Sequence, residues 1–106
     1  MMYFDIATIG TSLTAGTGTG WDGTSVRQGG QWQPFLERAL QPGKSQIVRC
    51  HNYGYGGKTS PWGISVEAPK VARLRPRIVT IEYSMNDCSI TQGISAAQSV
   101  ANAVTI

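Results

Sequence analysis

Charged side chains are scarce in this sequence. Its 106 residues include 9 Lys and Arg and 6 Asp and Glu, so charged residues make up 14% of the chain, against roughly 25% in typical soluble domains. A surface with so few charges indicates that more of it than usual is covered by something other than water.

Long apolar runs and cysteines are also few. No stretch approaches the roughly 20 apolar residues that span a bilayer, and the N-terminal MMYFDIATIG lacks the basic region that begins a secretory signal. We therefore expect no membrane span and, by default, a cytoplasmic protein. The two cysteines, Cys50 and Cys88, are too few for a disulfide scaffold.

The basic residues are concentrated in one segment. Four of the nine lie in KVARLRPR, residues 70–77. Many nucleic-acid-binding surfaces have aromatic residues interleaved with the basic ones, and this segment has none. The helix dipole also favours cations near a helix C-terminus. We interpret the cluster as a helix end and expect no nucleic-acid partner.

Three short β-branched runs indicate buried parallel strands, namely MYFDIATI (2–9), SQIVRCH (45–51) and RIVTIEYS (77–84). Segments with helical spacing alternate with them, at 31–40, 60–74 and 91–106. Alternating strands and helices predict the α/β class, here a three-layer sandwich with a parallel sheet. The length allows a single domain, 1–106.

Each predicted helix has a feature to test. The first should have an apolar stripe, the second contains a helix-breaking Pro69, and the third should pack one face on the sheet. That face carries Ile94, Ala97, Ala101 and Val104, and the stripe of the first carries Trp32, Phe35, Leu36, Ala39 and Leu40. Three strands leave a sheet edge unpaired, so we expect an incomplete α/β unit that another segment or chain completes.

Three loops follow the predicted strands at their carboxyl ends, where open α/β sheets build their sites. They are GTSLT from Gly10, NYGYGGKTS from Asn52 and SMNDC from Ser84. A serine, a glycine N–H and an asparagine amide on neighbouring loops are what acyl transfer requires. The Gly/Thr run from residue 10 to 20 fits neither a P-loop nor a dinucleotide loop in its spacing.

These loops resemble, in order, the first three blocks of the SGNH hydrolases, also called the GDSL family. GTSLT is similar to Gly-Asp-Ser-Leu, NYGYGGKTS to the second block, and SMND to Gly-x-Asn-Asp. The resemblance implies a flavodoxin-like fold with strand order 2-1-3-4-5, of which this chain would hold the first three strands. It also implies that Ser12 is the nucleophile, and that the Ser12 and Gly57 N–H groups and the Asn86 amide bind the oxyanion.

The sequence departs from the family at several points. Thr11 replaces the aspartate before the serine, Ser84 replaces a glycine, and the fourth block, Asp-x-x-His, is absent. His51 at the end of the second strand is an alternative base, although the family's histidine comes from a late loop on the far side of the nucleophile. Asp87 is interpreted as a loop-stabilising carboxylate rather than the triad acid.

The resemblance implies an ester hydrolase that needs no cofactor or metal. Its substrate would be a small acyl ester, a lipid or an acetylated sugar, with Trp21, Trp32 and Trp62 as candidate lining residues and Trp32 also a candidate for the core. A second polypeptide segment would supply the missing Asp and His. A non-catalytic, ligand-binding module of the same fold remains the alternative. The strand order separates Cys50 from Cys88 by about 10 Å, which predicts free thiols.

Overall fold

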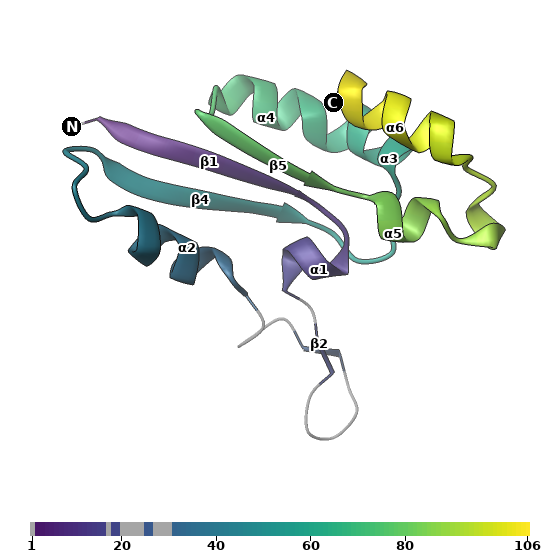
Figure 1. Ribbon diagram of the computed structural model, residues 1–106, viewed down its shortest axis with the longest axis horizontal. Coiled ribbons are helices and arrows are strands. Elements are labelled where there is room, and N and C mark those ends of the chain that lie inside the picture. The colour runs from purple at the N-terminus through teal and green to yellow at the C-terminus, as the bar shows by residue number, and fades with distance from the viewer. Residues whose placement is uncertain (1, 17, 20–24, 27–30) are drawn as a thin grey trace.

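The computed structural model describes residues 2–16, 18–19, 25–26 and 31–106 (Figure 1). Three parallel strands form its main sheet, β1 (Tyr3–Gly10), β4 (Ile47–Gly54) and β5 (Ile78–Glu82). Their order is β4-β1-β5, so the second and third main strands flank the first. The predicted α/β class and parallel sheet are confirmed.

The second strand is longer than its sequence pattern indicates. β4 continues three residues past the predicted end at His51, and it pairs with β1 from Tyr3↔Ile47 to Gly10↔Gly54. Pairing with the neighbouring strand extends it through polar residues that local propensity alone would assign to a loop. The Gly/Thr-rich stretch also forms a short antiparallel pair, β2 (Gly18–Thr19) and β3 (Ser25–Val26), which was not predicted.

Helix α2 (Gln33–Leu40) lies against one face and the outer edge of the sheet (Figure 1). Gln33 is buried and donates from Nε2 to Thr8 Oγ1 on β1, at 3.1 Å. The predicted apolar stripe is wrong at Phe35 and Ala39, which are both exposed. Helix α2 contacts the strands through polar side chains instead, because the N–H groups at a strand edge need acceptors. The Cys50 N–H, for example, donates to Glu37 at 2.7 Å.

The opposite face is covered by a helical run from Ser60 to Leu74. It comprises α3 (Ser60–Trp62), a π-helical turn (Gly63–Glu67) and α4 (Ala68–Leu74). Pro69 does not break the run, because it falls in the first turn of α4, directly after the π turn changes the hydrogen-bond register. Val71 of α4 forms the core with Ala7 and Ile9 of β1 and with Tyr83.

After β5 come α5 (Ser84–Asp87), a 3₁₀ turn (Ile90–Gln92) and α6 (Ala96–Thr105). The predicted packing face of α6 is wrong, since Ala97, Ala101 and Val104 are exposed and the buried residue is Asn102. Asn102 Nδ2 donates to Ser60 Oγ at 2.9 Å, so α6 is anchored on α3 by polar contacts. Within the described ranges, no helix has the length and apolar character to cross a bilayer.

Candidate active site

The nucleophile candidate lies at a sharp strand-to-helix turn. β1 ends at Gly10, Thr11 caps the four-residue helix α1 (Ser12–Ala15), and Gly16 closes it at φ 74°. The Thr11 side chain accepts from the Leu13 N–H, as an N-cap threonine does. Ser12 is therefore the first helical residue, half-buried at the carboxyl edge of the sheet.

A carboxylate from β5 organises this turn. Glu82 Oε2 accepts from Thr11 Oγ1 at 2.5 Å and from the Thr11 N–H at 3.2 Å, and the Glu82 carbonyl accepts from the same N–H at 3.1 Å. Thr11 stands where the Gly-Asp-Ser-Leu block has an aspartate, and its side chain binds the carboxylate of Glu82. Sequence reasoning missed Glu82, although a lone acid ending the apolar run IVTIE was a usable signal.

The second loop lies directly beside the first. The Tyr55 N–H donates to the Gly10 carbonyl at 2.9 Å, which carries the β4–β1 contact one residue past the sheet. A side chain at Gly56 would come within 3.8 Å of Ser12 Cβ, so the two loops are neighbours. Gly57 has φ 76°, a backbone conformation that glycine adopts without strain.

The third loop is joined to the second through Asn86. Its Nδ2 donates to the Lys58 carbonyl at 2.8 Å. A side-chain amide carries two N–H protons, so one remains for a ligand. The structure thus brings the loops of Ser12, Gly57 and Asn86 together at the carboxyl end of the sheet, as the sequence predicts.

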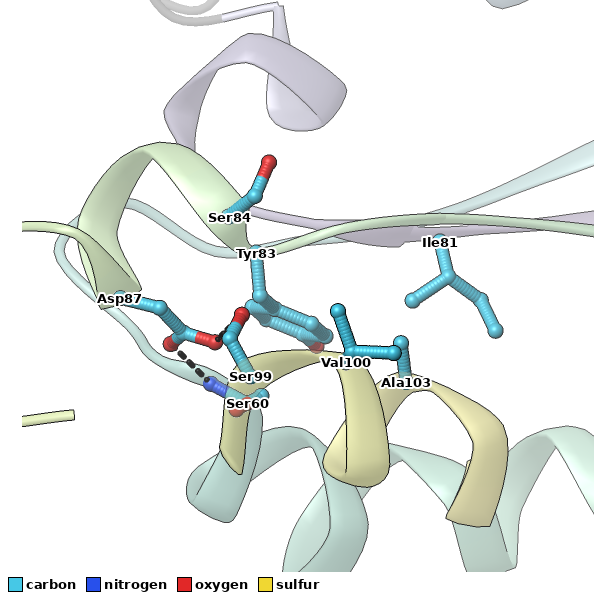
Figure 2. Close-up of a pocket in the computed structure, with 8 residues that line it drawn as sticks. All are labelled: Ser60, Ile81, Tyr83, Ser84, Asp87, Ser99, Val100 and Ala103. Atoms are coloured by element: carbon cyan, nitrogen blue, oxygen red, sulfur yellow. Dashed lines mark hydrogen bonds between the residues drawn. The ribbon is translucent and has the colours of Figure 1, made fainter. Parts of the chain in front are cut away.

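Asp87, next in the chain, is buried and holds two helices to α5 (Figure 2). It accepts from the Ser60 N–H at 2.8 Å and from Ser99 Oγ at 2.6 Å. Burial raises the pKa of this carboxyl, but the hydrogen bonds from Ser60 and Ser99 outweigh it, and the net pKa is lowered. These contacts make Asp87 a structural anchor, in line with its interpretation as a loop-stabilising carboxylate.

A shallow groove opens between β5 and α6 beside this anchor. Figure 2 shows Ile81 and Tyr83 on one side and Val100 and Ala103 on the other. Tyr83 is buried, and burial, followed by the nearby charges of Glu67, Glu82 and Asp87, raises the pKa of its phenol. Tyr83 packs in the core with Ala7, Ile9 and Val71, and within the described residues its hydroxyl has no hydrogen-bond partner.

His51 is placed away from Ser12. It lies in the middle of β4, opposite Ala7 of β1, and Ala7 is five residues before Ser12. The predicted position of His51 at the end of the strand is therefore wrong. Its Nε2 is 2.8 Å from Asp5 Oδ1, and Arg49 binds the same carboxylate at 2.8 Å. Five residues of strand span about 16 Å, so His51 is beyond hydrogen-bond reach of Ser12.

The remaining candidates have separate positions. Trp62 is on α3 near the second loop, whereas Trp32 caps the start of α2 and is half-buried. Trp21 lies outside the described residues. Cys50 and Cys88 are free thiols, half-buried and exposed respectively.

Comparison with known proteins decides the family. The profile of the GDSL-like lipase/acylhydrolase family matches residues 8–106, nearly the whole chain. The chain belongs to this family. A search of the curated proteins finds no significant match.

Two solved structures share the fold of this GDSL-like chain. AlinE4, described as an SGNH-hydrolase family esterase, is 25% identical with a TM-score of 0.74, and the match covers 100% of this chain and 52% of AlinE4. TesA is 26% identical with a TM-score of 0.69, over 95% of this chain and 51% of TesA. The chain therefore spans about half the length of these structures.

Proposed function

We propose that this chain provides the nucleophile and the oxyanion-binding groups of a serine ester hydrolase. The observation that carries the proposal is the meeting of the Ser12, Gly57 and Asn86 loops at one sheet edge, within a family of acyl hydrolases. Ser12 Oγ would attack the acyl carbon, and three N–H donors would hold the oxygen that becomes negative.

Each donor has a physical basis. Ser12 is the first residue of α1, and N–H groups of a first turn have no acceptor within their own helix. Asn86 uses one amide proton on Lys58 and has the other free to donate. Gly57 turns the second loop with a left-handed φ that glycine adopts without strain, directly after Gly56, the position of this loop that lies next to Ser12.

The general base is proposed to come from outside these 106 residues. A serine nucleophile needs a base within hydrogen-bond reach, and the chain's one histidine is held by Asp5 in the middle of the sheet. A segment carrying Asp-x-x-His, in the same polypeptide or a separate one, would supply the base and its carboxylate. Relatives about twice as long as this chain support that idea.

Reaction with a fluorophosphonate probe tests this proposal, because only an activated serine is labelled quickly. We expect slow labelling and nearly no ester hydrolysis by the chain alone. Adding a separately expressed segment that bears Asp-x-x-His should restore both. Ser12→Ala should abolish them, and Asn86→Ala should lower the rate about 10²- to 10³-fold.

Ser84→Ala is the matched control, because Ser84 is an exposed serine on the neighbouring loop and should be dispensable. Rapid Ser12-dependent hydrolysis by the chain alone would contradict an external base. Ligand binding without labelling, even with the added segment, would favour the alternative of a non-catalytic binding module.

A further inference from the structure

Two aromatic rings and a lysine gather around the oxyanion loop. Tyr55 precedes the two glycines of that loop, Lys58 follows them, and Trp62 lies one helical turn further on. The Tyr55 and Trp62 ring centroids are 5.4 Å apart with the rings tilted by 53°. Lys58 Nζ is 5.2 Å from the Trp62 centroid and 6.0 Å from the Tyr55 centroid. The ammonium therefore lies at the opening between two ring faces, which attract a cation.

The backbone of this group is fixed to the candidate active site at both ends. The Tyr55 N–H is bound by the Gly10 carbonyl, two residues before Ser12, and the Lys58 carbonyl is bound by Asn86. Any group bound by the Lys58 ammonium would thus be held at a set place relative to the proposed oxyanion donors.

The charge of Lys58 is not neutralised within the described part of the chain. Each described carboxylate has an internal partner, and none of them pairs with Lys58. The rings contact the ammonium but leave it N–H donors, of which it has three. An unpaired ammonium on a pre-ordered side chain is suited to a single anionic group, since little side-chain entropy remains to be lost on binding.

We propose that Lys58, Tyr55 and Trp62 form a subsite that binds a carboxylate on the substrate. This inference rests on the proposed function and deepens it, because it names the substrate class as esters that carry an acidic group. The ammonium would bind the carboxylate, and the exposed Tyr55 ring would cover the carbon chain between the carboxylate and the ester.

The test measures binding to the 106-residue chain with two non-hydrolysable ligands that differ in charge. N-methylsuccinamate is the acidic ligand, N,N′-dimethylsuccinamide is its neutral counterpart, and amide chemical shifts of the loop report binding at millimolar concentration. We expect the acid to bind about tenfold tighter, as a charge-assisted hydrogen bond predicts. Lys58→Met should abolish this preference and leave the binding of the neutral ligand unchanged.

Lys44→Met is the matched control. Lys44 also lies over an aromatic ring, 5.3 Å from the Phe4 centroid, but it precedes β4 at the opposite end of the sheet. The Lys44→Met variant loses the same net charge as Lys58→Met and should keep the preference for the acidic ligand. Equal binding of the two ligands, no binding of the acid, or an equal loss of preference in both lysine variants would overturn the proposal.

The same ligands separate this inference from the proposed function. Ser12→Ala should keep the acid preference, because binding does not use the nucleophile. If fluorophosphonate labelling fails even with the added Asp-x-x-His segment while the preference persists, the hydrolase proposal fails and the carboxylate subsite stands. If labelling succeeds and the preference is absent, only the subsite is wrong.

Discussion

The two outer strands of the sheet, β4 and β5, differ in whether side chains cover their free edges. On the outer edge of β4, the N–H group of Val48 donates to the side chain of Gln41, the C-cap of α2, and that of Cys50 donates to Glu37 within α2. On the outer edge of β5, no side chain of the described residues accepts from a strand N–H. Sheet edges in stable proteins are paired or covered, and within the described residues the β5 edge has no such cover.

Neighbouring isoleucines show the same contrast. Ile9 of β1 is directly opposite Ile81 of β5, and Ile6 is opposite Ile78. Ile9 and Ile6 are 0% and 1% exposed, whereas Ile81 and Ile78 are 38% and 45% exposed. Because the two pairs lie on opposite faces of the sheet, both faces of β5 are partly uncovered.

This difference bears directly on the candidate active site. Ser12 and Gly57 follow β1 and β4, on the covered side, while Asn86 follows β5 on the open side. Asn86 is therefore the proposed oxyanion donor that follows the partly uncovered strand. Whatever covers β5 would also fix the position of that amide, so a complementing segment would act on the oxyanion site as well as supply the base.

The largest expected effect comes from shortening each isoleucine of the Ile9–Ile81 pair. Ile9→Ala should lower the free energy of unfolding by about 2–5 kcal/mol, because it leaves a cavity among β1, α4 and Tyr83. Ile81→Ala should cost about 1 kcal/mol, because its side chain is already part-solvated. Urea unfolding of the two variants, monitored by circular dichroism, measures the difference.

The same pair can sharpen the comparison once a complementing segment is added. With β5 covered, the cost of Ile81→Ala should rise toward that of Ile9→Ala. A cost that stays near 1 kcal/mol in the complex would contradict a segment that packs on β5. Equal costs in the isolated chain would contradict the exposure difference itself.

Asp87 and Asp5 give a second, smaller contrast between the two sides. Asp87→Asn should cost about 1.5–3 kcal/mol at neutral pH, because it weakens charged hydrogen bonds to Ser60 and Ser99 in a buried place. Asp5→Asn should cost about 0.2–1 kcal/mol, since its partner Arg49 is 40% exposed and solvent screens the pair.

The pH dependence of both effects has the same sign. The hydrogen bond from Arg49 chiefly lowers the pKa of Asp5, and the hydrogen bonds to Asp87 outweigh burial and lower its pKa as well. A carboxyl with a lowered folded-state pKa stabilises the fold above its ordinary pKa of about 3.9, and this is lost as the pH falls through the folded value. The loss of stability in each variant should become smaller in acid, and only the loss in Asp5→Asn should become smaller in high salt. A strong salt effect on Asp87→Asn would contradict its burial.

The strand positions and the three site loops could be predicted because they depend on local pattern. Short β-branched runs marked β1, β4 and β5, and the glycine, serine and asparagine positions marked the three loops that the structure brings together. The position of His51 could not be predicted, since the end of β4 is set by pairing with β1 rather than by its own residues.

Long-range polar contacts account for the other errors. Glu82 could not be assigned to the Thr11 turn without the β1–β5 register. The predicted face of α6 left out Asn102, whose partner Ser60 is 42 residues earlier in the chain. Glu82 is half-buried and Asn102 is buried, and each has a hydrogen-bond partner far away in the sequence. The pattern of apolar residues along a helix or strand depends only on the polarity of each residue. It cannot predict that a polar residue is buried with a distant partner.

The smallest expected effect leaves stability unchanged and compares the two thiols. Cys50 lies on the covered strand β4, where burial and then the charge of Glu37 raise its pKa, whereas Cys88 is exposed next to α5. The thiolate is the reactive form, so Cys50 should react more slowly with Ellman's reagent at pH 8. Two phases should appear, with Cys88→Ser removing the fast phase and Cys50→Ser the slow one. Equal rates would mean that the β4 edge opens as readily as the β5 side, and the closure of that edge by α2 would then have to be abandoned.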